Sequence, residues 1–554
     1  MGALVSFVIL VSGVLLLGYP ISAVITHGLD PAQWPRVVIP PAEWFGYFSS
    51  FEITNLLGVY WQMLIGRSPA FPYGGFLHFV GVLAPSAIWI IVQFFGAPKQ
   101  PLRDTTGVFG EAHFATSTEL ATMNKGLELG LDPTTGRPVR VKVEGTLITI
   151  APPRKGKTSG LLIPNLAFPE AGSWDGPAVV IDTKGEVYRA VGDRRRALGR
   201  EVICLDPLGL TDGVDRWNPL RGVDPSDILY LQRTALALLP EATGNNESSA
   251  YFRNRAVDLI TGAMIAAIAT GKPSPAVVHR LLCDDAALIG ELNKPEKKSP
   301  AALAALDILR SDAKTRDPIK STASQAFQWL ADDRLRWLVG RSTFDLAELS
   351  SGDADIFIAV PPEYKRLLAP FLRWFLSDLF ASIRSERPKE RILIFVDEAA
   401  ALGRFDEILT AAAELPGYGA SLWTLWQDRS QIVSLYGEAG ASILLNTAEV
   451  ATIFNFSSVD PDETERWSRT LGDYTALVST TSDATQGKGA STTTRAPQAA
   501  RLMTPSALVA MPSHELLCFV NASAYSPHPM RLAKTVAHND RRFDRLIQST
   551  RPVQ

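Results

Sequence analysis

Residues 146–167 have the sequence TLITIAPPRKGKTSGLLIPNLA, and this stretch decides the fold. A β-branched apolar run at 146–150 is followed by a loop with glycine and two lysines at 151–160, and then by an apolar helical pattern. Strand, loop and helix in this order are typical of a P-loop, whose backbone N–H groups surround phosphate oxygens at a helix N-terminus. The stretch predicts an α/β fold with a nucleotide-binding loop.

The loop supplies the side chains that this chemistry needs. Lys157 can reach the outer phosphates of ATP, and the hydroxyl of Thr158 can bind Mg²⁺. The pattern is imperfect because Ala151 stands where the general motif has its first glycine, so a chance match remains an alternative. The residues predicted to contact ATP are Arg154, Lys155, Gly156, Lys157, Thr158 and Ser159.

A second half of the site follows the apolar run at 392–396, which ends in two adjacent carboxylates, Asp397 and Glu398. In P-loop enzymes the first carboxylate after such a strand holds Mg²⁺, and the next can polarise the water that attacks the γ-phosphate. We therefore predict Mg²⁺ binding by Thr158 and Asp397, and a catalytic role for Glu398 together with Lys157. The alternative is that Asp397 only caps the helix that begins near Glu398.

Gln427 follows another apolar run, at 421–426. Ligands of open α/β sheets lie along the carboxyl ends of the strands, so Gln427 is predicted to sense the γ-phosphate or to position water. The alternative is that it only opens the turn before the helix at Arg429.

The two half-sites, Lys157 and Asp397, are separated by 240 residues, far more than a compact P-loop core requires. Apolar runs at 178–182, 202–206 and 355–360 predict further strands of the sheet. Between them, residues 226–339 show helical apolar spacing and no clear strand pattern. The sequence predicts a nucleotide-binding domain at 104–225 and 340–545, with an all-α insertion at 226–339.

The first hundred residues contain two uncharged stretches, at about 4–26 and 74–97, each long enough to cross a bilayer as a helix. The intervening residues 27–73 are rich in aromatic residues and proline, as expected of a loop at the far membrane face, here a periplasmic loop. A cleaved signal peptide is the alternative for the first stretch, but no lysine or arginine precedes it. Residues 1–103 are thus predicted to be a membrane anchor, with the bulk of the chain in the cytoplasm.

Composition narrows the function only slightly. A net charge of -3 gives no overall basic character, so any contact with DNA would rest on local patches. The three cysteines are odd in number and far apart, which favours buried thiols in a reducing compartment. The seven histidines show no zinc-ligand spacing, so a metal hydrolase is not predicted.

Residues 477–500 are rich in Ser, Thr and Gly and are predicted to form a flexible loop.

Several motifs in order resemble the TraG-type coupling proteins of type IV secretion, the conjugative DNA transfer ATPases. They are GEAHFAT (110–116), APPRKGKTSG (151–160), VVIDTKGE (179–186), RWNPL (216–220), FVDEAAALGRFDEI (395–408), GYGASLWTLWQDRSQIVSLYG (417–437) and SRTLGDYT (468–475). The resemblance covers most of the chain after its first hundred residues. It implies a RecA-like ATPase core with an all-α domain, two transmembrane helices in the bacterial inner membrane, and a homo-hexameric ring around a channel.

The resemblance also implies partners and a task. Such proteins recruit a relaxase-bound DNA strand or effector proteins to the inner-membrane components of the secretion channel, and they power transfer by ATP hydrolysis. No residue decides between these cargoes; contact with single-stranded or duplex DNA is expected without sequence specificity, since the helical segment has no basic helix. In a ring, an arginine from a neighbouring subunit often completes the site. The candidates are Arg404, Arg429, Arg466 and Arg501.

Two other functions remain to be weighed against this one. A segregation-type DNA pump would share the core and the anchor but would lack the helical insertion and RWNPL. A docking receptor that binds nucleotide with little turnover is suggested by Ala151, whereas Lys157, Thr158, Asp397 and Glu398 argue for hydrolysis. An ATPase assay separates the receptor from the enzyme.

Overall fold

The computed structural model describes residue 29 and the ranges 102–104, 106–168, 173–241, 247–294, 299–456, 460–482 and 492–548. In that part of the chain no helix combines the length and the apolar character needed to cross a membrane. The predicted spans at about 4–26 and 74–97 lie outside the described residues, as does the loop between them apart from residue 29, so they stay predictions. The chain divides into two units, one of Met1–Val108 with Thr475–Gln498 and one of Phe109–Tyr474 with Ala499–Gln554.

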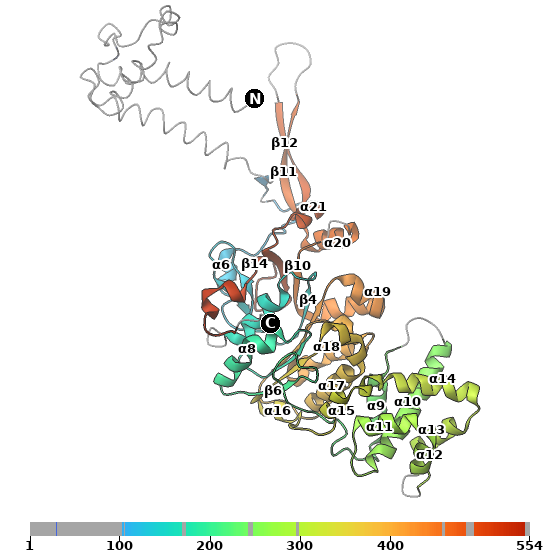
Figure 1. The fold of residues 1–554 in the computed structure, drawn as a ribbon. Coiled ribbons are helices and arrows are strands. Elements are labelled where there is room, and N and C mark those ends of the chain that lie inside the picture. Colours follow the sequence, from blue (N-terminus) through green and yellow to red (C-terminus); the bar gives the residue numbers. More distant parts are fainter. Residues whose placement is uncertain are drawn as a thin grey trace, which may run out of the picture. The chain divides into compact units, whose positions relative to one another are not determined.

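The larger unit is built on an 11-stranded sheet with the order β3-β2-β14-β13-β10-β4-β9-β8-β5-β7-β6 (Figure 1). From β10 to β6 neighbouring strands run parallel, and from β3 to β10 they run antiparallel. Every strand predicted above is present, and the α/β class is confirmed. The strands are β2 (Leu127–Leu131), β3 (Pro138–Val141), β4 (Thr146–Ile150), β5 (Ala178–Asp182), β6 (Glu201–Leu205), β7 (Ala354–Ala359), β8 (Ile392–Val396), β9 (Ala420–Trp426), β10 (Ala448–Phe454), β13 (Glu515–Val520) and β14 (Met530–Ala533).

Both faces of the parallel strands are covered, which explains why these strands are continuously apolar. Along β8, Ile394 and Val396 belong to one hydrophobic cluster, while Leu393 and Phe395 belong to another. The first cluster includes the long helix α17 (Lys365–Ser385) and α18 (Glu407–Tyr418), and the second includes α7 (Ile163–Ala167) and α8 (Glu186–Ala197). The helices form layers on the two sides of the sheet, as in a doubly wound fold.

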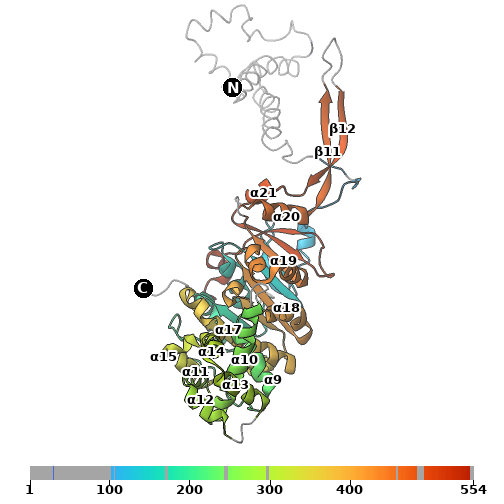
Figure 2. The same cartoon turned by 90° about the vertical axis from the view of Figure 1, so that its right-hand side faces the viewer.

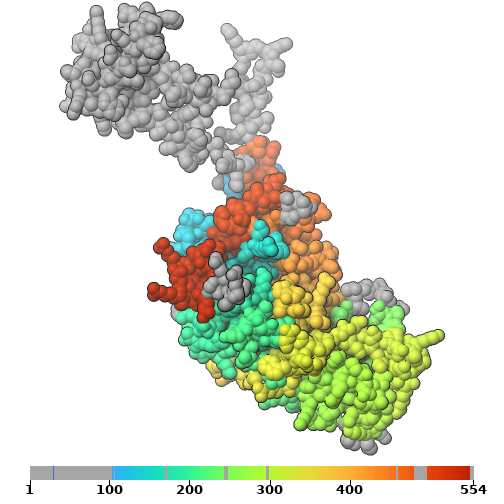
Figure 3. Space-filling view, viewed as in Figure 1, coloured from blue at the N-terminus to red at the C-terminus, as the bar shows by residue number. Residues whose placement is uncertain are grey.

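Between β6 and β7 the described residues form only helices and turns, and those from α9 to α14 gather into a lobe of their own (Figure 3). The central helix α10 packs against five others, α9 and α11 to α14. Side-chain caps from Asp227, Ser274, Asp284, Ser299 and Asp312 define where the five others start. The elements are α9 (Ile228–Leu238), α10 (Glu247–Ile268), α11 (Pro275–Cys283), α12 (Asp285–Leu292), α13 (Pro300–Arg310), α14 (Ala313–Gln325), η7 (Gln328–Ala331), α15 (Asp333–Leu338) and α16 (Glu348–Ser351).

The close packing of α10 on α13 depends on Gly262. A Cβ placed at Gly262 would lie 2.3 Å from the Cβ of Ala305, which is closer than two carbon atoms can approach. Small residues at a helix crossing allow the two backbones to come together, so this contact explains a glycine in the middle of a long helix, where it otherwise lowers stability. The remaining helical elements are α6 (Ser117–Leu120), η4 (Thr158–Leu162), η8 (Pro362–Tyr364), η9 (Ala399–Leu402), α19 (Arg429–Thr447), α20 (Pro461–Leu471), α21 (Pro505–Val509), η10 (Ala537–Asn539) and η11 (Arg541–Phe543).

The second sheet corrects one prediction. Residues 477–500 were expected to form a loop, but β11 (Asp473–Ser482) and β12 (Thr492–Arg501) extend into this segment and pair in a three-stranded sheet with β1 (Leu102–Arg103) (Figure 2). The Ser/Thr-rich composition suggested a loop because it lacks apolar anchors. Threonine is nevertheless β-branched and favours extended backbone, and ladder hydrogen bonds require no apolar side chain.

Candidate nucleotide-binding site

The predicted phosphate-binding loop follows β4, which lies between β10 and β9 in the parallel part of the sheet. Ala151, the last residue before the loop, donates its N–H to the carbonyl of Trp426 on β9 at 2.8 Å. The backbone then takes the left-handed conformation at Arg154 (φ 61°) and again at Gly156 (φ 80°). Such local reversals turn successive N–H groups toward one point and form an anion-binding concavity. This conformation is unusual for a residue with a side chain, which makes Arg154 a strained position.

The helix behind the loop begins at Thr158 with one π turn, η4, before it continues as α7. Pro164 has no N–H and cannot donate to the carbonyl four residues earlier. The residue before it, Ile163, donates to the carbonyl of Thr158, five residues back, which is the hydrogen bond of a π turn. Of the other predicted contact residues, Lys155 is exposed, and the Ser159 hydroxyl donates to the carbonyl of Gly156 at 3.4 Å. The loop thus presents its lysines and its backbone at the start of a helix.

Asp397, directly after β8, is the meeting point of the two predicted half-sites. The Lys157 Nζ donates to the Asp397 carbonyl at 2.9 Å and lies 3.7 Å from its carboxylate. The hydroxyl of Thr158 lies 3.5 Å from the same carboxylate. Asp397 does not cap the following helical turn, η9, because its carboxylate faces Lys157 and Thr158 instead. The predicted Mg²⁺ ligands therefore lie side by side, with only oxygen donors, the kind that Mg²⁺ prefers.

Glu398 is held by two side chains from other elements. Lys365, at the start of α17, forms an ion pair with it, and the Gln427 side chain donates to it at 3.3 Å. The backbone N–H of Gln427 is not part of this contact, because it donates to the side-chain oxygen of Gln431 at 3.0 Å. Asp428, not Gln427, caps α19. The structure thus brings Glu398 and Gln427 together at the carboxyl ends of neighbouring strands, where the sequence placed them.

Three residues of this site were not identified from the sequence. The Thr183 hydroxyl donates to the Asp397 carboxylate at 3.1 Å, and Lys365 pairs with Glu398. Asp182 precedes Thr183 at the end of β5 and accepts three backbone N–H groups, one from Lys184 in the turn before α8 and two from the first turn of α8. A signal did exist for two of them, because Asp182 and Thr183 lie in the VVIDTKGE motif after a predicted strand. Nothing in the sequence pointed to Lys365.

The region around the loop is positively charged. Lys534, just after β14, donates to Asn455 and to the carbonyl of Ser513, both at 2.7 Å. Burial and, to a smaller extent, the charge of Lys155 lower the pKa of Lys534 to about 8. Two ammonium groups that repel each other beside a phosphate-binding loop are stabilised when an anion binds between them. The electrostatics therefore favour a polyanionic ligand such as ATP.

The buried carboxyl of Asp182 gives a testable pH dependence. Burial raises the pKa of Asp182 from 3.8 to about 6, and the Asp397 carboxylate contributes to the rise. The folded chain therefore retains a proton that the unfolded chain releases, so stability from this group is complete below about pH 4 and is lost as pH rises through about 6. We expect the thermal unfolding midpoint of wild type, relative to an Asp182→Asn variant, to fall between pH 4 and 7. Identical pH profiles for the two proteins would contradict this.

The four arginines proposed to act on a neighbouring subunit differ in their surroundings. Arg404 pairs with Asp406 at 3.0 Å, Arg429 with Glu438, and Arg501 with Glu465 at 3.3 Å. Arg466 is exposed on α20, and no ion pair of its side chain is found among the described residues.

A family model described as "Type IV secretory system Conjugative DNA transfer" matches residues 136–551. Among curated relatives, the VirD4 protein of Rhizobium radiobacter is 23% identical over 412 residues, which cover 72% of this chain and 58% of that protein. The conjugal transfer protein TraG of the same organism is 26% identical over 401 residues, covering 68% and 60%. The type IV secretion system-coupling protein VirD4 of Bartonella quintana is 25% identical over 458 residues, covering 73% and 71%. The chain thus spans about three fifths of the length of two of these three relatives.

Solved structures share the fold. The bacterial conjugative coupling protein TrwBdeltaN70, in complex with sulphate, aligns with a TM-score of 0.59 at 16% identity, covering 79% of this chain and 96% of that chain. TrwB in complex with ADP and Mg²⁺ aligns equally well, with a TM-score of 0.59 at 16% identity over the same shares. At this identity the likeness concerns the fold alone. Because the family model covers well over half of its residues, the chain belongs to the type IV secretory system conjugative DNA transfer family.

Proposed function

We propose that the chain is a membrane-anchored ATPase that acts as the coupling protein of a type IV secretion system. It recruits relaxase-bound single-stranded DNA, effector proteins, or both to the inner-membrane components of the channel, and it powers transfer by ATP hydrolysis. The observation that carries the enzymatic part is the convergence of Lys157, Thr158, Asp397, Glu398 and Gln427 at one edge of the sheet. Family membership supports the coupling role.

The residues suit ATP and Mg²⁺. Mg²⁺, when bound with ATP, neutralises charge on the phosphates. Thr158 and Asp397 would hold it, and Thr183 fixes the Asp397 carboxylate through its hydroxyl. Lys157 exchanges its present bond to the Asp397 carbonyl for the outer phosphates. The repulsion between Lys155 and Lys534 is relieved when phosphate binds, and the loop already has the conformation that binds an anion, so little reorganisation is needed on binding.

The hydrolytic role falls to Glu398. As a carboxylate after the Mg²⁺-binding residue, it accepts a proton from the attacking water, and Gln427 holds it in place by a hydrogen bond. Its ion pair with Lys365 must open or rearrange for this task, because a carboxylate oxygen that holds the ammonium group is not free to accept a proton from water. Lys365 thus belongs to the positioning groups of the proposed site.

The membrane location, the oligomeric state and the contact with DNA are further parts of this proposal. The chain lies in the bacterial inner membrane with two spans, at about 4–26 and 74–97, and with its bulk in the cytoplasm. It forms a homo-hexamer that contacts single-stranded or duplex DNA without sequence specificity. Arg466, exposed on α20, is the arginine proposed to reach the neighbouring site.

The test is ATP hydrolysis by the full-length chain in detergent or nanodiscs, with and without single-stranded or duplex DNA. We expect steady-state turnover that rises several-fold with DNA, and background activity for a Lys157→Ala variant. Turnover that is indifferent to DNA would favour effector-protein cargo instead, and stimulation by duplex DNA alone would favour a segregation-type pump. ATP binding without turnover would contradict the enzyme and leave a nucleotide-binding docking receptor.

A further inference from the structure

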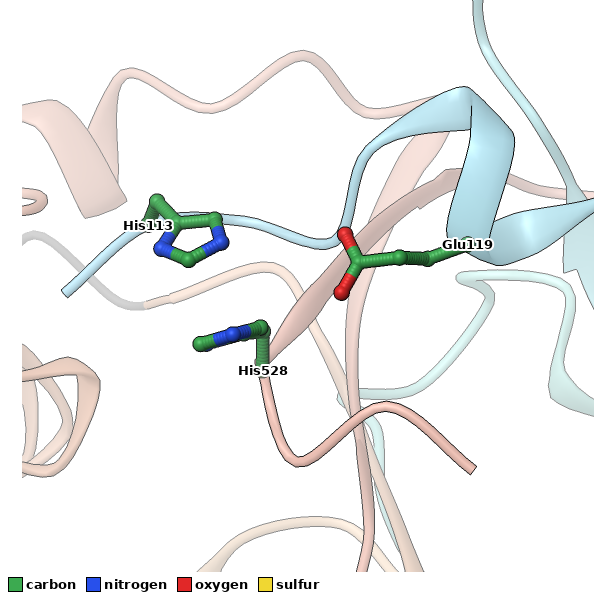
Figure 4. Close-up of side chains that lie close together, drawn as sticks. All are labelled: His113, Glu119 and His528. Atoms are coloured by element: carbon green, nitrogen blue, oxygen red, sulfur yellow. The ribbon is translucent and has the colours of Figure 1, made fainter. Parts of the chain in front are cut away.

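A cluster of three potential metal ligands, His113, Glu119 and His528, lies outside the nucleotide site. Each residue offers one ligand atom, and these atoms all lie within 4.8 Å of one another. The imidazole rings of His113 and His528 have their centroids 3.6 Å apart. Figure 4 shows the Glu119 carboxylate pointing toward the two rings. The sequence showed no zinc-ligand spacing because the two histidines come from nearly opposite ends of the described chain.

The backbone around the cluster is fixed by short contacts. The N–H of Ala115 donates to the carbonyl of Pro529 at 2.9 Å, which ties the segment of His113 to that of His528. Glu119 belongs to a capping box with Thr116 at the start of α6. The Ser526 hydroxyl donates to the other Glu119 carboxylate oxygen at 2.7 Å. The Glu119 side chain and the two backbone segments that carry the histidines are therefore positioned before any ligand arrives, which reduces the entropy lost on binding.

The protonation states also suit a metal. The Nδ1 of His113 lies 3.0 Å from the carbonyl of Glu111, a bond that requires the proton on Nδ1 and leaves the Nε2 lone pair for a ligand. A second hydrogen bond of this kind is typical of metal-binding histidines. Glu119 accepts hydrogen bonds from the Thr116 backbone and from the Ser526 hydroxyl, and these bonds orient its carboxylate. Its two oxygens accept three hydrogen bonds and retain lone pairs.

We propose that His113, Glu119 and His528 bind one divalent transition metal ion, with Zn²⁺ as the best match. Two imidazoles and one carboxylate suit Zn²⁺, whereas Mg²⁺ and Ca²⁺ select oxygen ligands. Metal–ligand bonds of about 2.0–2.2 Å in a tetrahedron place neighbouring ligand atoms roughly 3.3 Å apart. The two imidazole rings, whose centroids lie 3.6 Å apart, therefore move apart by rotation about their side-chain bonds when the ion binds. Three protein ligands leave the fourth position to water.

The bound ion would join two segments that are distant in sequence. One precedes the large sheet, between β1 and β2, and the other leads into β14. Because the unfolded chain does not bring these segments together, binding energy adds to folding stability, and the unfolding midpoint rises with metal concentration. The role inferred is thus structural, and it is independent of ATP.

The experiment is zinc binding by the tag-free, full-length chain in detergent, stripped with a chelator and titrated with Zn²⁺ against a chromophoric competitor. We expect one high-affinity site per chain. His113→Gln and His528→Gln should weaken it by about 100-fold or more, since even the loss of a residue that only hydrogen-bonds a metal ligand costs roughly 10- to 100-fold. Glu119→Gln should weaken it as well, although glutamine can keep the capping box. His514→Gln is the matched control, because His514 is exposed and lies outside the cluster, and it should change nothing.

Unfolding measurements distinguish a variant that has lost the metal site from a variant that is misfolded. Zn²⁺ should raise the unfolding midpoint of wild type and of His514→Gln, and should leave the midpoints of His113→Gln and His528→Gln unchanged. If wild type shows no stoichiometric site, or if the three cluster variants bind Zn²⁺ as tightly as wild type, the proposal is overturned.

Discussion

A Glu398→Gln variant is expected to bind ATP with nearly unchanged affinity and to hydrolyse it about 10²- to 10⁴-fold more slowly, the range of a lost general base. Glutamine has almost the same shape and keeps an oxygen that can accept the bond from Gln427. It cannot take a proton from water at neutral pH. Lys157, Thr158 and Asp397, which are expected to bind the nucleotide, are untouched. Steady-state turnover and the affinity for a fluorescent ATP analogue, measured on the same preparation, check the two parts of this prediction.

A matched control comes from α18, where Glu414 is a half-exposed carboxylate paired with Arg384. Glu414→Gln makes the same chemical change away from the predicted half-sites and should leave turnover within about twofold, as expected of most surface substitutions. If Glu398→Gln retains wild-type turnover, Glu398 is not the base and the assignment fails. If it loses ATP affinity to the same extent as turnover, its role is in binding instead.

Much of the candidate site could be predicted because each part has a local signal. A P-loop needs a glycine and a lysine at fixed positions between a strand and a helix, and residues 146–167 display them. Asp397, Glu398 and Gln427 each follow an apolar strand, and parallel strands end at a common edge. The convergence of these residues follows from the strand and helix patterns of the sequence and from the common edge at which parallel strands end.

The remaining parts depend on chain segments that meet only in three dimensions. Lys365 begins a helix 33 residues before Glu398, and no local pattern says that this helix starts beside β8. The strand order, in which β4 inserts between β9 and β10, is equally invisible in the sequence. The segments of His113 and His528 are joined by one backbone hydrogen bond, from the N–H of Ala115 to the carbonyl of Pro529. Composition was misleading for β11 and β12, because polar residues can form a ladder through their backbones alone.

One such long-range contact should dominate the stability of the sheet. Arg195 on α8 and Asp355 on β7 form a fully buried ion pair, with nitrogen–oxygen distances of 2.6 and 3.0 Å. Arg195 also donates to the carbonyls of Trp174 and Gly176, and Asp355 accepts the N–H of Ala178. The pair thus joins a helix, two strands and the loop before β5. Every polar atom that the pair buries has a partner, which is the condition under which a buried charge is tolerated.

Replacing one partner, as in Arg195→Met, is therefore expected to cost about 3–5 kcal/mol of unfolding free energy, because Asp355 is left buried without its counter-ion. In a chain of this size the unfolding midpoint should fall by about 3–5 °C. Arg469→Met, which breaks the exposed pair with Glu465, should shift the midpoint by less than about 1 °C, since exposed pairs contribute little. The double variant Arg195→Met/Asp355→Leu decides the mechanism. Removing both charges should destabilise less than the two single changes added together, whereas simple additivity would mean that the pair is not the source of the loss.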